Sequence, residues 1–160
     1  MFGLIKTWKA LEAKGIMGIN RRNADYVLKY NKRSLYPIVD DKIITKQRAI
    51  EAGIHVPEMY GIIETEKDID KLKDIVKDHT DFVVKPAVSS GGRGTGRYTA
   101  TDAASRSAAI NDAMHHLRRG RTVMVQRYLE EVDRKGEVSL VYFNGVLSHA
   151  VEKAPRSEEH

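Results

Sequence analysis

A lysine at the end of a short apolar segment, followed by a run of glycines, is the part of this sequence whose residue types could do chemistry. Residues 81–85 read Asp-Phe-Val-Val-Lys, which is typical of a buried strand that ends at Lys85. Residues 89–96 read Ser-Ser-Gly-Gly-Arg-Gly-Thr-Gly. Because glycine reaches backbone conformations with positive φ, such a loop can direct its N–H groups at phosphate oxygens. A fixed ammonium group on Lys85 could meet the same phosphates.

Two well-known phosphate-binding motifs are excluded by the residues around this loop. The chain contains no GxxxxGK[ST] sequence, which the P-loop requires. The dinucleotide fingerprint leads directly into a helix, whereas residues 97–99, Arg-Tyr-Thr, are typical of an extended segment. Two interpretations stay open from these residues: a nucleotide site of another kind, or a glycine-rich surface hairpin beside a core strand.

The elements that must position this loop begin with three predicted helices. The first covers residues 5–14, and Asn20 could cap the second. Pro37 then interrupts the chain, and Asp40 could cap a third helix over residues 41–52. The pattern that follows predicts a strand over residues 59–63 and an amphipathic helix over residues 66–77. After the loop it predicts a short return strand at residues 98–99 and a helix that Thr101 or Asp102 caps and that ends at about residue 119.

The last third of the chain is predicted to be mostly strand. Residues 122–126 have the β-branched content of a strand, and residues 130–135 form a charged turn. Asn144-Gly145 is a strong two-residue hairpin signal between strands over residues 138–143 and 146–151. His115 and His116 are adjacent, so they point in different directions; we interpret them as helix-surface residues rather than metal ligands.

This order of elements predicts an α+β fold with two small lobes, antiparallel sheets and a nucleotide-sized cleft between the lobes. A seam is expected near residue 100. The predicted parts are an N-terminal helical segment over residues 1–40 and a first lobe with the glycine-rich loop over residues 41–100. A second lobe with a helix and an antiparallel sheet covers residues 101–155, and a polar tail covers residues 156–160.

Composition narrows the class of protein further. The chain has 160 residues, no cysteine and a formal net charge of +5, so thiolate metal sites are excluded and polyanionic ligands are favoured. The amino-terminal apolar run is too short for a signal peptide, and no segment is long enough to span a bilayer, so we expect a cytoplasmic protein without a membrane partner. A nucleic-acid or ribosome-binding surface is the alternative, carried by basic residues at 21, 22, 33, 118, 119 and 121.

The motifs, taken in order, resemble the ATP-grasp superfamily. Residues 83–94 are similar to the central lysine and flexible phosphate loop of these enzymes. Residues 123–129 resemble the next strand and the linker that reads adenine through main-chain groups, and residues 135–141 resemble the strand whose acidic residue contacts ribose. Residues 41–57 resemble the entry helix, which carries the first ATP lysine.

Two branches of the superfamily share features with this chain. The amino-terminal stretch up to Lys42 resembles the alpha-L-glutamate ligase-like branch, related to the ribosomal-protein glutamate ligases. The part from Thr122 onward is more similar to glutathione-synthetase-type proteins. The resemblance implies an ATP-dependent carboxylate–amine ligase, in which ATP converts a carboxylate into an acyl-phosphate and an amine displaces the phosphate; the glutamate ligase-like branch implies glutamate as that amine.

The resemblance also implies roles for individual residues. In this assignment two lysines and the loop bind the phosphates of ATP. The residues are Lys42 (with Lys46 as the alternative), Lys85, Ser89, Ser90, Gly91, Gly92 and Gly94. The resemblance assigns adenine to the linker residues Gln126, Arg127, Tyr128 and Leu129, and ribose to Glu137. Lys153 would face the acyl-phosphate as the catalytic residue. Arg127 departs from the acidic or small residue usual at the linker.

The metal half of such a site has no counterpart in this sequence. Relatives use Mg²⁺ with ATP and carry its acidic and asparagine ligands in a later segment, so no metal ligand is assigned here. We therefore expect a truncated ATP-binding part that binds nucleotide without turnover, and a catalytically inactive scaffold is a further alternative. The expected partners are ATP, a small carboxylate and an amine or a protein acceptor, and a second copy of the chain could supply a missing lobe.

Overall fold

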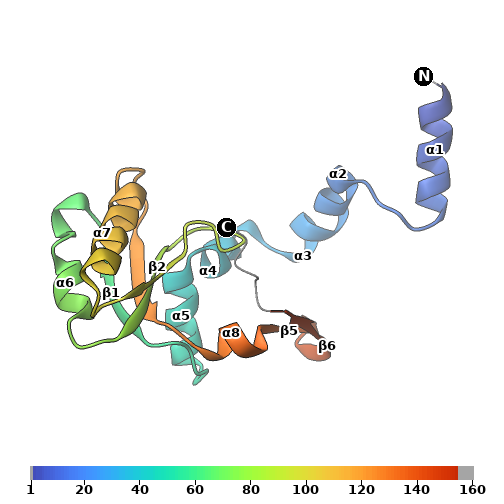
Figure 1. The fold of residues 1–160 in the computed structure, drawn as a ribbon. Helices are drawn as coiled ribbons and strands as arrows, with labels where there is room; N and C mark the ends of the chain where they lie inside the picture. Colours follow the sequence, from blue (N-terminus) through green and yellow to red (C-terminus); the bar gives the residue numbers. More distant parts are fainter. Residues whose placement is uncertain (1, 155–160) are drawn as a thin grey trace. The chain divides into compact units, whose positions relative to one another are not determined.

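The computed structural model describes residues 2–154, and contacts between residues divide the chain into two compact units, Met1–Ile54 and His55–His160 (Figure 1). This boundary differs from the expected seam near residue 100, because strands from both sides of that position share one sheet. None of the helices in residues 2–154 combines the length and the apolar character needed to cross a bilayer.

The first unit consists of helical segments. They are α1 (Phe2–Ala13), α2 (Ile19–Arg22), the π-helix η1 (Asn23–Val27), α3 (Leu28–Tyr30), the 3-10 helix η2 (Arg33–Leu35), α4 (Tyr36–Asp40) and α5 (Lys42–Glu51). The segments from α2 to α4 bury no residue.

Three local predictions for the first unit are corrected by its helix ends. Asn20 does not cap a helix, because α2 already begins at Ile19 with Gly18 before it. Pro37 lies in the first turn of α4, where its missing N–H is no loss. Asp41, not Asp40, caps α5: its carboxylate accepts hydrogen bonds from the N–H groups of Ile43 at 2.8 Å and Ile44 at 3.3 Å.

A four-stranded antiparallel sheet is the centre of the second unit. Its strands are β1 (Met59–Ile63), β2 (Asp81–Pro86), β3 (Gly96–Thr99) and β4 (Val123–Arg127), in the order β1-β4-β2-β3. The sequence predicted each of these strands to within two residues. The order brings β2 between β3 and β4, so the strand that ends in Lys85 and Pro86 is paired on both edges.

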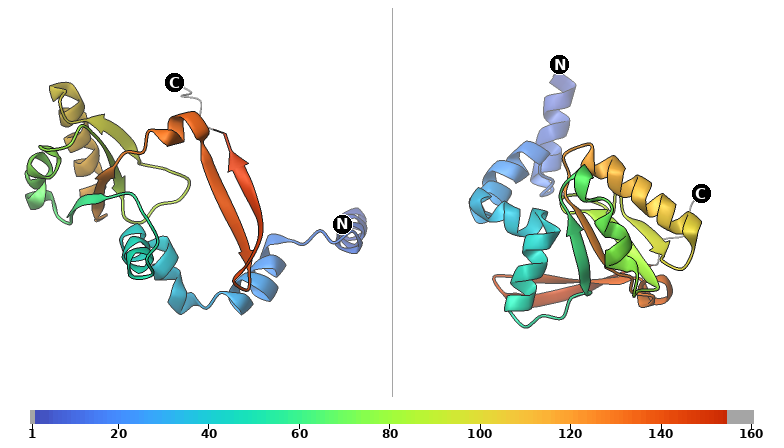
Figure 2. Two further views of the ribbon diagram at one scale, coloured as in Figure 1. Left: turned by 90° about the horizontal axis from the view of Figure 1, so that it is seen from below. Right: turned by 90° about the vertical axis from the view of Figure 1, so that its left-hand side faces the viewer.

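Helices cover one face of this sheet. They are α6 (Lys71–Val76) and α7 (Ala103–Leu117), and Figures 1 and 2 show both on the same side of the strands. Phe82 and Val84 of β2, with Val125 of β4, are at most 1% exposed and pack against the apolar faces of these helices. Asp102 caps α7 by accepting from the N–H groups of Ala104 and Ser105, as one of the two predicted alternatives.

Two predictions for the second unit, one of a helix and one of a turn, differ from the structure. The helix predicted over residues 66–77 is divided into the 3-10 helix η3 (Glu66–Asp68) and α6, because aspartates at 68 and 70 are poor helix formers. The charged turn predicted at 130–135 is the short helix α8 (Glu131–Lys135), which Gly136 ends with a φ of 70°.

The last two strands form a sheet of their own. They are β5 (Glu137–Phe143) and β6 (Val146–Lys153), two long antiparallel strands in Figure 2. Asn144 and Gly145 join them with φ values of 50° and 79°, which is the two-residue turn that the sequence predicts.

Tyr98 joins β3 to α7 and generates a prediction about pH. Its buried hydroxyl donates a hydrogen bond to the carboxylate of Asp112, and burial, followed by that carboxylate, raises the pKa of Tyr98 above its usual value. Above a pH of about 10 the unfolded chain therefore loses a proton that the folded chain keeps, and the free energy of unfolding falls with rising pH.

We expect Tyr98→Phe to remove this part of the pH dependence. Between pH 9 and 11, urea unfolding of the parent chain should lose stability more steeply than that of the variant, by up to about 1.4 kcal/mol per pH unit. The other tyrosines are present in both proteins, so the difference between the two slopes reports Tyr98. Parallel slopes would contradict the assignment.

Candidate functional site

The glycine-rich loop between β2 and β3 has the backbone geometry that only glycine adopts easily. Gly91, Gly92 and Gly94 have φ values of 64°, 71° and 71°. Two short turns close the loop on itself: the N–H of Arg93 donates to the carbonyl of Ser90 at 3.3 Å, and the N–H of Thr95 donates to that of Gly92 at 3.2 Å. Ser90 and these glycines are exposed and Ser89 is half-buried, so the loop can meet a ligand.

The pairing of β2 with β4 decides which side chains share a face of the sheet. Lys85 pairs with Met124, and Val83 pairs with Gln126. Because side chains alternate along a strand, these four residues lie on the face opposite the core residues Phe82 and Val84. Lys85 is half-buried at the start of the loop, and Gln126 is 8% exposed. The structure thus brings the predicted phosphate lysine and the first linker residue to one face.

The linker after β4 lines a polar cavity. Arg127, Tyr128 and Leu129 border a cavity of about 430 Å³ together with Glu58, Tyr60, residues 78–81 and Glu130 and Glu131. Arg127 pairs with Phe82, so its side chain belongs to the helix-covered face of the sheet, opposite to that of Gln126. Burial, followed by the hydrogen bond to Asp133, raises the pKa of Tyr128, while the nearby Arg97 acts in the opposite direction.

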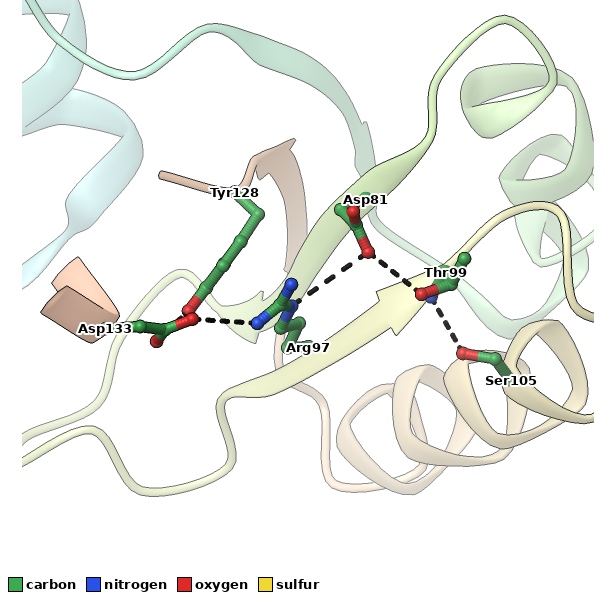
Figure 3. A network of polar contacts seen from close by, with 6 residues as sticks. All are labelled: Asp81, Arg97, Thr99, Ser105, Tyr128 and Asp133. Carbon is green, nitrogen blue, oxygen red and sulfur yellow. Dashed lines mark hydrogen bonds and ion pairs between the residues drawn. The ribbon is translucent and has the colours of Figure 1, made fainter. Parts of the chain in front are cut away.

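Arg97, the second residue of β3, connects the end of the loop to this linker (Figure 3). Its guanidinium group stacks 3.9 Å from the ring centre of Tyr128 and donates to the carboxylate of Asp133 at 2.9 Å. A longer ion pair of 3.9 Å reaches Asp81 at the start of β2. Thr99 extends the network by donating to Asp81 at 2.9 Å. Sequence reasoning missed Arg97, whose place beside the glycines was its only signal.

The hairpin brings the other two predicted residues together. Glu137 and Lys153 are direct partners at the open end of the β5–β6 ladder, and both are exposed. Next to them, a groove of about 940 Å³ is lined by Leu129 of the linker, residues of α8, and Val138, Glu152 and Ala154. Leu129 therefore borders both cavities, one with the polar residues around β1 and β2 and one with the base of the hairpin.

The remaining two predicted lysines belong to the first unit. Lys42 is the first residue of α5, and Lys46 lies one turn later, 6% exposed. Burial lowers the pKa of both ammonium groups, and Asp41 partly offsets this at Lys42. A buried lysine is uncommon unless its ammonium group has a specific task or partner.

The position of His116 differs from the one interpreted from the sequence. It was expected on the surface of its helix, but it is 4% exposed and its Nε2 lies 2.9 Å from the carbonyl oxygen of Gly94. The signal was available in the sequence: Ala109, Ala113 and His116 are spaced i, i+4, i+7, so His116 continues the stripe of small residues that faces the sheet.

Metal binding has no candidate in the described part of the chain. Within residues 2–154, no group of three or more histidine, aspartate or glutamate side chains is arranged to hold a metal ion. No metal ligand is therefore assigned, and the chemistry below is derived from the side chains and N–H groups of the chain. The loop and Lys85, by contrast, offer the N–H groups and the positive charge that fit a polyphosphate.

Comparison with solved structures defines the class of protein. The crystal structure of D-cycloserine synthetase DcsG matches 76% of this chain and 41% of its own, with a TM-score of 0.61 and 26% identity. A RimK domain ATP-grasp protein from Sphaerobacter thermophilus matches 76% of this chain and 44% of its own, with a TM-score of 0.54 and 20% identity. The predicted α+β, ATP-grasp-like fold is thereby confirmed.

Sequence comparison gives the family. Residues 21–118 match the model of the sugar-transfer associated ATP-grasp proteins, and the chain belongs to this family. The cycloserine biosynthesis protein DcsG of Streptomyces lavendulae is 40% identical over 75 residues, which are 46% of this chain and 23% of DcsG. The chain thus spans less than half the length of these relatives.

The coupling free energy between Arg97 and Asp133 can be measured by a double-mutant cycle. We expect Arg97→Ala and Asp133→Ala to be coupled by about 0.5–1 kcal/mol in urea unfolding, since the pair is partly exposed but supported by stacking on Tyr128. The exposed pair Arg118–Glu66, at 3.5 Å, is the control and should give a smaller coupling. Coupling no larger than the control, or unchanged in 1 M salt, would contradict the role of the network.

Proposed function

We propose that this chain binds ATP as part of an ATP-dependent carboxylate–amine ligase. The observation that carries the proposal is the common face of Lys85 and Gln126 at the strand end that leads into the loop with the positive-φ glycines. Membership of an ATP-grasp family and the fold shared with DcsG support it. The predicted site residues enter with the roles that the resemblance gives them.

In this proposal the loop and the lysine hold the phosphates. N–H groups of residues 89–94, other than that of Arg93, which bonds to Ser90, donate to phosphate oxygens, and Lys85 supplies the charge that offsets them. The resemblance gives Lys42 or Lys46 the role of a second cation. Such an arrangement stabilises the charge on a phosphoryl group in transfer without a protein nucleophile.

The linker and the hairpin hold the rest of the nucleotide. Main-chain groups of residues 126–129 bind adenine, and the apolar side of Leu129 borders the groove that reaches the base of the hairpin. Glu137 accepts hydrogen bonds from the ribose hydroxyls, and its cross-strand partner Lys153 faces the acyl-phosphate. Mg²⁺ that accompanies ATP would offset part of the phosphate charge, and no ligand for it is assigned within residues 2–154.

In the reaction, a carboxylate oxygen of the substrate attacks the terminal phosphorus of ATP, and ADP leaves. The nitrogen of the amine then attacks the acyl carbon, phosphate leaves, and the amine gives up a proton. Glutamate as the amine is the finer prediction from the resemblance. Phosphate release from ATP that requires glutamate would support this prediction, and release only with other amines would replace glutamate by those amines.

Replacement of Lys85 tests the proposal. Lys85→Met keeps the length of the side chain and removes its charge, so we expect ATP affinity in isothermal titration to fall about 10- to 100-fold, the range for a hydrogen bond to a charged group. Lys73→Met, on an exposed lysine of α6, is the matched control and should leave the affinity unchanged.

Measurement of ATP binding to the parent chain tests the proposal directly. Saturable binding of ATP, measured with and without Mg²⁺, is the expected result. The absence of binding at millimolar ATP in both conditions would overturn the proposal, as would equal affinities of the parent chain and Lys85→Met.

A further inference from the structure

His116 is a buried polar residue for which the proposed chemistry has no use. It lies in the last turn of α7, and its Nε2 is 2.9 Å from the carbonyl oxygen of Gly94. A carbonyl oxygen can only accept a hydrogen bond, so Nε2 carries the proton and donates it. The contact joins two residues that are 22 positions apart and links a helix of the core to the exposed glycine-rich loop.

The second ring nitrogen shows why packing alone does not explain a histidine here. Nδ1 of His116 is buried and has no hydrogen-bond partner among the described residues. An unpaired buried polar atom is unfavourable, and an apolar side chain at the end of α7 would avoid this cost. The bond from Nε2 to the loop is the contribution that only the imidazole makes.

The absence of a side chain at Gly94 leaves space for the imidazole ring of His116. A Cβ atom at this position would lie 2.4 Å from Cε1 and 2.8 Å from Nε2 of His116, and the φ of +71° already disfavours other residues. Gly91 has a similar φ of +64°, but a Cβ there would meet no atom within 4 Å. Gly91 therefore needs glycine for its backbone conformation alone, whereas Gly94 also needs it to let the ring approach.

We propose that His116 is a positioning residue for the phosphate loop. Its Nε2–H holds the carbonyl of Gly94, which fixes the last turn of the loop before β3 and keeps the preceding N–H groups directed at the ligand. A loop that is already ordered loses less conformational entropy when phosphate binds. This inference rests on the proposed function, because it assigns the benefit to a nucleotide polyphosphate, and His116 itself does not touch the ligand.

The first experiment separates positioning from general stability. In His116→Asn the amide is too short to reach Gly94, so ATP affinity should fall about 5- to 10-fold, the value of one lost hydrogen bond. In His116→Gln the amide nitrogen reaches the position of Nε2, and the affinity should return to within about twofold. Adenosine, which has no phosphate, should bind all three proteins equally, since the linker that holds the base is unchanged.

The second experiment needs no ligand. Long-range ¹H–¹⁵N correlation spectra of the ¹⁵N-labelled chain should show His116 as the Nε2–H tautomer with a slowly exchanging ring proton. Gly94→Ala should abolish this signal, because the new methyl group occupies the place of the ring. Gly91→Ala introduces the same unfavourable φ without the collision, so it should keep the signal and serves as the matched control.

The outcomes distinguish the two proposals. If the parent chain binds no ATP, the proposed function fails, and the tautomer spectra still decide whether His116 holds the loop. If the parent chain binds ATP and His116→Asn binds it equally well, the positioning role alone is overturned. An Nδ1–H tautomer, a signal that persists in Gly94→Ala, or an equal loss of adenosine and ATP affinity would also overturn it.

Discussion

The register of β2 against β4 is the constraint on which the rest of the structure depends. It pairs Val84 with Val125 on the face that α6 and α7 cover, and Lys85 with Met124 on the other face. A slip by one residue would drive the ammonium group of Lys85 into the core and turn Phe82 out of it. Since an unpaired buried charge is far more costly than a lost apolar contact, the same alternation secures the fold and delivers the lysine to the candidate site.

A loop of small residues would ordinarily sample many conformations, but this one is fixed on its far side. Gly94 is held by His116, and the strand that follows is joined to α7 through Tyr98 and Asp112 and to the linker through Arg97. These contacts lie between Gly94 and Thr99, and the two short turns of the loop add hydrogen bonds from Arg93 to Ser90 and from Thr95 to Gly92.

Much of this architecture follows from local pattern. The strand that ends at Lys85 was predicted because β-branched and aromatic residues precede a lysine, a proline and glycines, and the hairpin turn because Asn144-Gly145 suits positive φ at both positions. These features depend on neighbours in sequence, which a single chain displays. The ATP-grasp resemblance of the loop and linker has the same origin, and the family match over residues 21–118 confirms that the chain is an ATP-grasp protein.

What sequence reasoning missed depends on neighbours in space. His116 was expected in solvent because its partner Gly94 is 22 residues away, and Arg97 gained its importance only from Asp133 and Tyr128. The short helix α8 was taken for a turn because it is too brief to show a period and too charged to suggest burial. Helix packing and cross-strand contact decide these cases.

The hairpin of β5 and β6 carries large apolar side chains on both of its faces, and Val138, Leu140, Phe143 and Val146 are all more than half exposed. An isolated two-stranded ladder of this kind has little to hold it together besides its turn and its own backbone bonds. Its outer N–H and C=O groups are also open to any further strand of suitable sequence. At high concentration, self-association of the chain should therefore begin along these strand edges rather than at the well-buried four-stranded sheet.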